Sequence, residues 1–248
     1  GVLILKNCLA VLPGIQIGAY LNGWPLDPTA FDEADSIMLY MDGGANHPLL
    51  KEDHLRVMGD LMRQGVGLIC AHYAVEVPKD KAGAELLNWI GGYYEHGFST
   101  NPHWLANFTN LPTHPITRGV KPFEAKDEWY FNMRFRPEMK GVVPILVAKP
   151  SDETRQGATA APRGPYAHIV AANGRDEIVM WATERADGGR GVGFTGGHAH
   201  ANWGNDNYRK IILNALFWTA RKEVPADGVP SKVSEDELKQ NLDPKPQK

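Results

Sequence analysis

Residues 66–71, VGLICA, form an unbroken apolar run that follows directly on a segment with helical periodicity. That segment runs from Pro48 to Gly65, and its apolar stripe consists of Leu50, Leu55, Met58, Leu61 and Met62. An unbroken apolar strand is typical of a parallel sheet that is covered on both faces. A further apolar run at 35–44, DSIMLYMDGG, precedes the helix. Strand, helix and strand in this order predict a crossover unit and therefore an α/β fold.

Other segments add helices and strands to this unit. We expect helices at residues 1–12, 81–96 and 205–221. We expect strands at residues 15–24, 103–111, 142–150, 166–173, 177–185 and 191–197. The later strands follow one another so closely that we expect antiparallel or hairpin pairing among them. In the Pro-rich tail from Val224, Ser234 and Glu237 have the spacing of a capping box for a short helix.

Charge and composition exclude several classes of protein. The 248-residue chain has 26 basic and 29 acidic side chains and a net charge of -3, so it lacks the positive charge typical of nucleic-acid binding. No apolar run approaches the roughly 18 residues that a membrane-spanning helix needs. We therefore expect a soluble protein with no nucleic-acid partner and no membrane span. The two cysteines, Cys8 and Cys70, lie inside apolar runs, as buried thiols do.

His72 follows the strand VGLICA directly, at a corner where the chain turns toward the next helix. Ligands of open α/β sheets bind at the carboxyl ends of the strands, and a nucleophile elbow occupies such a corner. The glycines that usually flank an elbow residue are missing here. His72 therefore has two interpretations, a functional group or a hydrogen-bonded histidine that lines the sheet edge. Cys70, two residues earlier, is expected to be buried and not to act as a nucleophile.

The stretch KDEWYFNMRF, residues 126–135, contains two carboxylates, an aromatic pair and an amide. Side chains alternate in an extended segment, so Glu128, Tyr130 and Asn132 are expected on the face opposite Asp127. Such a polar face suits a hydroxylated ligand. The alternative interpretation is a solvated edge strand.

Two histidines lie one residue apart in the stretch GGHAH, residues 196–200. If the chain is extended here, His198 and His200 share one side and can bind one metal ion, or place a base beside a binding group. No H-E-x-x-H or C-x-x-C motif supplies further ligands nearby, so His72 and Glu128 would have to complete the site. The cofactor stays open: the pattern allows a divalent metal, and no nucleotide-binding motif is present.

Taken together, several stretches resemble the ThuA-like, or trehalose-utilisation, domain family, a relative of the class I glutamine amidotransferase fold. The matching stretches cover most of the chain and are LMRQGVGLICAHYA, LLNWIGGYYEH, THPITRGV, KDEWYFNM and GRGVGFTGGHAHANWGNDNYRKIILNALFWTA. The resemblance implies a flavodoxin-like three-layer α/β sandwich with a mainly parallel central sheet plus some antiparallel strands. It places His72 at the elbow position, where the amidotransferases have a cysteine.

The resemblance also implies how the chain is divided. We expect a ThuA-like domain at residues 1–223, lacking its first strand because the chain opens inside a helix, and an extended C-terminal arm at 224–248. The opening without Met suggests a segment upstream of Gly1. Members of this family are often exported, so export is compatible with the sequence, and so is a homo-oligomer.

The resemblance would gather His72, Glu128 and His198 around one pocket at the top of the sheet. It implies a sugar substrate, a disaccharide such as trehalose or its 3-keto derivative. The first hypothesis is a hydrolase or lyase in which Glu128 is the acid and His72 or His198 the base. An imidazole titrates near 6.5, which suits a base at neutral pH. For elimination from a 3-keto sugar, His200 or a metal would stabilise the enolate.

The second hypothesis is a sugar-binding or accessory module without catalysis. The aromatic rings of Trp129, Tyr130, Trp203 and Tyr73 could stack on pyranose faces, and the amides of Asn132 and Asn202 could bind hydroxyls. Substituting His72 and Glu128 distinguishes the two hypotheses, because a binder has no turnover to lose. A third option, amidotransferase chemistry through Cys70, would require glutaminase activity that is lost in Cys70→Ser.

Overall fold

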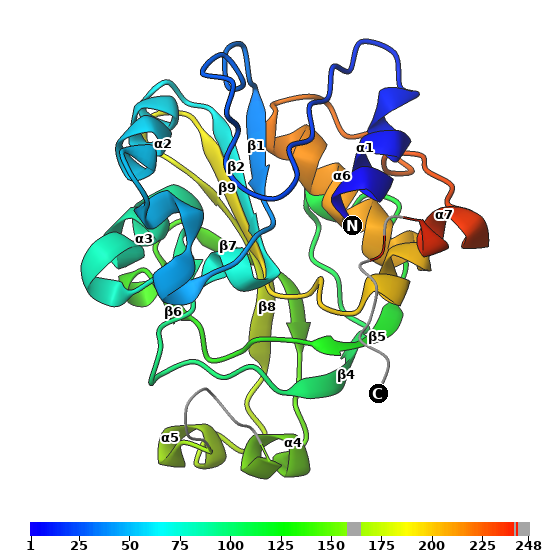
Figure 1. The fold of residues 1–248 in the computed structure, drawn as a ribbon. Coiled ribbons are helices and arrows are strands. Elements are labelled where there is room, and N and C mark those ends of the chain that lie inside the picture. Colours follow the sequence, from blue (N-terminus) through cyan, green and yellow to red (C-terminus); the bar gives the residue numbers. More distant parts are fainter. Residues whose placement is uncertain (158–164, 241, 243–248) are drawn as a thin grey trace.

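A computed structural model describes residues 1–157, 165–240 and 242, with a five-stranded mixed sheet at its centre (Figure 1). In spatial order the strands are β1 (Ser36–Leu39), β2 (Gly67–Ala71), β9 (Arg190–Phe194), β8 (Glu177–Glu184) and β7 (Val142–Ala148). The first three run parallel, whereas the pairings of β9 with β8 and of β8 with β7 are antiparallel. The predicted α/β class is confirmed, although parallel pairings do not outnumber antiparallel ones in this sheet.

Helices cover the central sheet on both faces (Figure 1). They are α2 (His54–Arg63) and α3 (Ala84–Ile90) on one face, and α1 (Val2–Ala10) and α6 (Asp206–Thr219) on the other. Leu68 and Cys70 of β2 belong to the core beneath α2 and α3, while Ile69 and Ala71 belong to the core beneath α1 and α6. Because both faces of β2 are buried, an unbroken apolar sequence is needed there.

Two antiparallel strand pairs lie outside the main sheet. They are β4 (His103–Phe108) with β5 (Phe123–Glu128), and β3 (Gly92–Tyr93) with β6 (Arg134–Phe135). The remaining helices are α4 (Asp152–Gly157), α5 (Ala167–Val170) and α7 (Glu235–Lys239). The predicted capping box of Ser234 and Glu237 is confirmed at the start of α7. In the described part of the chain, no helix is long and apolar enough to cross a membrane.

Short helical turns connect these elements. They are η1 (Gly44–Asn46), η2 (Pro48–Leu50), η3 (His72–Val75), η4 (Lys79–Gly83), η5 (Pro115–Thr117), η6 (Pro137–Met139) and η7 (His200–Gly204). Two of them modify our expectations. The helix predicted from Pro48 begins at His54, because Pro48–Leu50 form a separate turn and Glu52 has a positive φ of 47°. Within residues 81–96, the turn η4 leads directly into the shorter helix α3, which ends at Ile90 because Gly91 follows with a φ of 86°.

Two strand predictions were wrong. Residues 15–20 alternate between half-buried and exposed positions, and Ile15 and Ile17 pack on the core, but the segment pairs with no strand among the described residues. Apolar alternation thus produced an extended chain lying on the core without a ladder. The second segment, 166–173, contains the helix α5, whose one buried residue is Ile169. A short apolar run does not distinguish helix from strand by its periodicity.

The carboxyl ends of β2 and β9 lie side by side, with Ala71 paired to Phe194. The residues that follow these strands therefore emerge at the same edge of the sheet. The last residue of β5, Glu128, is brought to the same place, as described next. The fold thus joins three segments that are far apart in sequence.

Candidate active site

His72 is the first residue after β2 and begins the turn η3. Its backbone has a φ of 54°, in the left-handed region that non-glycine residues rarely occupy. Holding such a residue there costs on the order of 1–2 kcal/mol, and strain of this kind is concentrated at functional sites. A strained strand-to-helix turn is also how α/β hydrolases present their nucleophile above the sheet. The backbone thus displays the His72 imidazole at the sheet edge.

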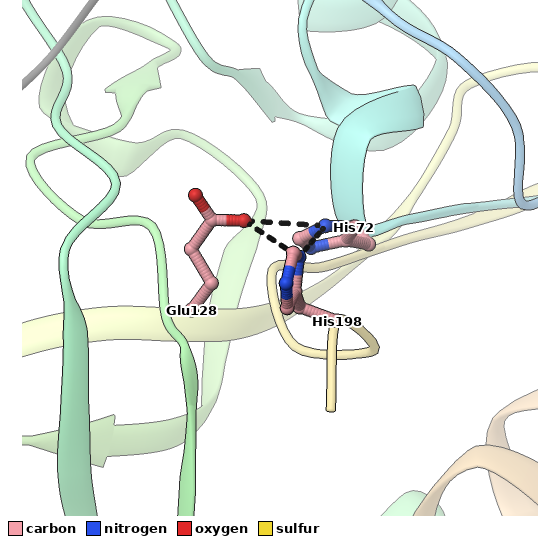
Figure 2. A group of neighbouring side chains, drawn as sticks. All are labelled: His72, Glu128 and His198. Atoms are coloured by element: carbon pink, nitrogen blue, oxygen red, sulfur yellow. Dashed lines mark hydrogen bonds and ion pairs between the residues drawn. The ribbon is translucent and has the colours of Figure 1, made fainter. Parts of the chain in front are cut away.

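Three side chains converge at this edge: His72, Glu128 and His198 (Figure 2). His198 Nδ1 lies 3.0 Å from Glu128 Oε2 and 3.4 Å from His72 Nε2. His72 Nε2 lies 3.5 Å from the same carboxylate oxygen. One carboxylate oxygen and two imidazole nitrogens thus form a compact triangle. The convergence expected for these three residues is present in the structure, and their chemical roles stay predictions.

A backbone hydrogen bond fixes the orientation of the His72 imidazole. Its Nδ1 lies 3.2 Å from the backbone carbonyl oxygen of Thr195, which can only accept a hydrogen bond. Nδ1 therefore carries the proton, and Nε2 presents its lone pair to the triangle. Burial lowers the pKa of His72, although the Thr195 carbonyl and the charge of Glu128 oppose this effect. The neutral imidazole is favoured at neutral pH, as a base or a ligand requires.

Glu128 is held by its other oxygen. The Asn101 side-chain amide donates to Glu128 Oε1 over 2.9 Å, which leaves Oε2 turned toward the two histidines. The hydroxyl oxygen of Tyr130 lies 3.4 Å from His72 Nε2. The side chains of His72 and Glu128 are 13% and 15% exposed, whereas that of His198 is 51% exposed. The cluster therefore opens to solvent beside His198.

The neighbouring carboxylate, Asp127, has a different environment. It is 1% exposed and points to the opposite face of β5, as the alternation predicted. Its hydrogen-bond donors are the backbone amides of Gly197, Ala199 and Glu128, the Asn202 side-chain amide and the Tyr208 hydroxyl. Burial alone would raise the pKa of Asp127, but these hydrogen bonds lower it below its ordinary value. Asp127 thus fixes the loop that carries His198.

The structure does not bring all the predicted site residues to the triangle. The Asn132 amide donates to the carbonyl of Phe98, and its carbonyl oxygen accepts from Arg175. Trp129 and Trp203 are both fully buried, and the Asn202 side-chain amide donates to Asp127. Tyr130 contacts His72, and Tyr73 is exposed next to it in sequence. The sugar-binding roles of these side chains stay predictions.

His198 and His200 point to different partners. His200 Nε2 lies 3.0 Å from the carbonyl oxygen of Leu238, whereas His198 Nδ1 faces Glu128. The two side chains diverge because the strand ends at Phe194, Gly197 has a φ of 117°, and residues 198–199 bend into the turn η7. The premise of an extended chain through residue 200 was therefore wrong.

One ionisable residue of this region was not singled out from the sequence. Burial, with a further contribution from the charge of Glu128, raises the pKa of Glu76 to about 7. Glu76 follows the turn η3 and pairs with Tyr94 through an isolated bridge. Its sequence context, YAVEVP, gives no sign of this environment, since the burial arises from distant segments. A carboxyl group that holds its proton near pH 7 is a candidate proton donor.

Cys70 does not belong to the cluster. It is fully buried in β2, and burial raises the pKa of its thiol to about 12. A thiol in this state does not supply the thiolate that nucleophilic catalysis needs. The burial of Cys70 therefore argues against amidotransferase chemistry through its thiol.

Comparisons with known proteins agree with this architecture. A family model named ThuA and described as trehalose utilisation matches residues 19–219. The chain is similar in structure to a ThuA-like protein from Parabacteroides merdae ATCC 43184, with a TM-score of 0.56 at 18% identity over 94% of this chain and 87% of that one. A ThuA-like protein from Bacteroides uniformis ATCC 8492 gives 0.51 at 16% identity over 75% and 69%. A search of curated proteins found no match.

Proposed function

The chain belongs to the ThuA, or trehalose-utilisation, family, and from this membership we propose that it is a carbohydrate-active enzyme. Membership itself indicates a role in sugar metabolism. The finer proposal is a hydrolase or lyase that acts on a disaccharide or glycoside, or on its 3-keto derivative, by acid/base chemistry. The observation that carries it is the convergence of His72, Glu128 and His198 at one edge of the sheet.

Hydrolysis of a glycoside needs a proton for the leaving oxygen and an activated water. The free Nε2 of His72 can accept a proton from water, and its lowered pKa keeps it unprotonated at neutral pH. The carboxyl group of Glu128 can deliver a proton to the leaving oxygen. Glu76 provides a second carboxyl group, which retains its proton up to about pH 7 because burial raises its pKa.

Elimination from a 3-keto sugar would use the same groups. The 3-keto group makes the C2 proton acidic, and His72 Nε2 would take that proton. The electron pair moves onto the keto oxygen as an enolate and then expels the oxygen bonded to C1. That oxygen leaves with a proton from the carboxyl group. Proton transfer by a positioned side chain contributes about 10²–10⁴-fold to such reactions.

The competing function is a sugar-binding module without turnover. The exposed ring of Tyr73 favours this alternative, because an accessible aromatic face beside polar groups can stack on a pyranose. Catalysis fits the cluster better, since stacking needs no imidazole–carboxylate triangle.

The test compares turnover and binding in matched variants. Wild type, His72→Ala and Glu128→Gln are assayed with trehalose and 3-keto-trehalose by product analysis, and sugar affinity is measured by calorimetry. Glu124→Gln is the control, because it makes the same change at an exposed position of β5. We expect kcat/KM to fall about 10²–10⁴-fold in the first two variants only. Unchanged turnover in both would overturn the catalytic assignment, and sugar binding without any turnover would establish the module.

We further propose that the fold is the flavodoxin-like three-layer sandwich of the class I glutamine amidotransferases. Helices on both faces of the sheet support this, as does the left-handed His72 after β2. The domain at 1–223, the arm at 224–248, a homo-oligomer and export are likewise proposals.

A further inference from the structure

We propose that His72 Nε2, Glu128 Oε2 and His198 Nδ1 bind one divalent transition-metal ion, with Zn²⁺ the best chemical fit, and leave a further coordination position open. This inference deepens the proposed function, because it concerns the same side chains, and its test does not require turnover. It replaces the His198–His200 pair that the sequence suggested, since those two side chains diverge.

The spacing of the three donor atoms carries the inference. Zn–N and Zn–O bonds of about 2.0–2.1 Å in a tetrahedron place neighbouring ligand atoms about 3.3 Å apart. The three separations here are 3.0, 3.4 and 3.5 Å. The atoms therefore already occupy three corners of a tetrahedron of the right size. Two histidines and one glutamate with an open fourth position are also a ligand set of catalytic zinc sites.

The hydrogen bonding of His72 leads to the same conclusion. Because its Nδ1 proton is committed to the Thr195 carbonyl, Nε2 can only accept. Its contacts with His198, Tyr130 and Glu128 are 3.4–3.5 Å long, beyond ordinary hydrogen-bond length. The lone pair of Nε2 is thus available. A metal ligand whose other nitrogen donates to a carbonyl has the orientation that metal-binding histidines need.

Charge supplies a third observation. Glu128 is largely buried, and its ion pairs among the described residues are with His72 and His198, not with Lys or Arg. The largely buried carboxyl group therefore has no permanently charged partner among the described residues, and a divalent ion would supply one. The Asn101 amide fixes the second carboxylate oxygen, so Oε2 is already aimed at the ion.

The open position follows from exposure. His198 is the half-exposed member of the three, so the fourth corner of the tetrahedron faces solvent. A water or a substrate oxygen could bind there. A zinc ion lowers the pKa of bound water and polarises a carbonyl. With the ion bound, this water would take over from His72 as the base and Glu76 would take over from Glu128 as the proton donor, while the substrate class stays the same.

The test measures metal binding directly. The full chain is freed of metal with a chelator and titrated with ZnCl₂ by calorimetry, and Co²⁺ is added as a spectroscopic probe of coordination geometry. We expect one ion per chain and the intense visible absorption of four-coordinate Co²⁺. His72→Ala, Glu128→Gln and His198→Ala should each weaken Zn²⁺ binding more than about 100-fold, and Asn101→Ala about 10-fold.

His200→Ala is the matched control, since it removes a histidine two positions from His198 and leaves the three donors in place. Its Zn²⁺ affinity should stay within about threefold of wild type, because His200 bonds to the Leu238 carbonyl and not to any of the three donors. Loss of a residue that holds a metal ligand in place would cost about 10-fold or more. Circular dichroism checks that each variant is folded. Failure of the wild type to bind one equivalent would overturn the inference, and so would equal losses in His198→Ala and His200→Ala.

The two proposals can fail separately. Stoichiometric Zn²⁺ binding that depends on the three donors supports the metal site, even if no sugar is converted. Full sugar turnover by the metal-free protein, with no saturable Zn²⁺ binding, would overturn the metal site and leave the acid/base proposal standing.

Discussion

Asp127 and Glu128 are adjacent carboxylates on one strand, yet they lie in opposite environments. Asp127 faces the interior and accepts hydrogen bonds from amides, an asparagine and a tyrosine. Glu128 faces the sheet edge, where one oxygen accepts from Asn101 and the other meets two imidazole nitrogens. The first has its hydrogen-bonding capacity used by the protein. The second, Glu128, has one oxygen, Oε2, that is available to bind a ligand.

This difference separates stability from function. A buried carboxylate whose hydrogen bonds are all made locks the segments around it, and breaking it leaves donors unpaired. Asp127 joins β5 to the loop 197–199 and to α6 in this way. The Asp127 environment therefore holds His198 in place, while the cluster of His72, Glu128 and His198 is free to act on a ligand.

The largest effect is expected from His72→Asn. Asparagine tolerates the left-handed backbone at this position, so the fold should be kept while the imidazole is lost. We expect kcat/KM to fall about 10³-fold, equivalent to about 4 kcal/mol in the transition state. The unfolding free energy should change by less than about 1 kcal/mol. Urea unfolding measures the first quantity to be compared, the unfolding free energy, and steady-state kinetics measures kcat/KM. A loss of stability without a loss of turnover would contradict the functional role assigned to His72.

Glu76→Gln should have the next largest effect, on pH dependence. The pKa of Glu76 is raised from 4.5 to about 7, so its native carboxyl group holds a proton that the unfolded chain releases. The stability of the wild type should therefore fall as the pH rises from 4.5 to about 7 and then level off. This loss is on the order of 3 kcal/mol.

Glu76→Gln removes that loss, so the variant should be more stable than wild type at pH 8 and similar to it near pH 4.5. Urea unfolding at several pH values measures the difference. Glu124→Gln, an exposed glutamate on β5, should show no such trend. A stability difference that does not vary with pH would contradict the raised pKa.

The smallest effect is expected from Tyr208→Phe, which tests the structural role of Asp127 without changing the cluster of His72, Glu128 and His198. The variant removes the 2.6 Å hydrogen bond from the Tyr208 hydroxyl and leaves four other donors on Asp127. We expect the unfolding free energy to fall by about 1.5 kcal/mol. Turnover per folded molecule should change less than about threefold. Tyr20→Phe, an exposed tyrosine, serves as the control.

The sequence was sufficient to predict part of this picture. The unbroken run VGLICA placed His72 at the end of a buried strand, and alternation along 126–132 separated Glu128 from Asp127. Both patterns depend on local geometry, which is why they succeeded. The stretch GGHAH singled out His198, and the family resemblance grouped it with His72 and Glu128.

Other features depend on contacts that no local pattern records. Four of the five hydrogen bonds of Asp127 come from residues 70 or more positions away, and Glu76 is bridged to Tyr94 of another segment. The strand predicted at 15–24 failed because a strand needs a partner, which apolar alternation does not guarantee. His200 diverged because the chain bends at residues 198–199, before the turn η7.

The most direct test of the account measures Asp127→Asn and Glu128→Gln side by side, each for unfolding free energy and for kcat/KM on the sugar substrate. Each variant replaces a carboxylate by an amide of the same shape. We predict that Asp127→Asn loses about 3 kcal/mol of stability, because amide hydrogens then oppose its donors. Glu128→Gln should stay within about 1 kcal/mol of wild type and lose turnover at least about 100-fold. Equal destabilisation of both variants, with turnover per folded Glu128→Gln molecule unchanged, would contradict the division between a structural and a functional carboxylate.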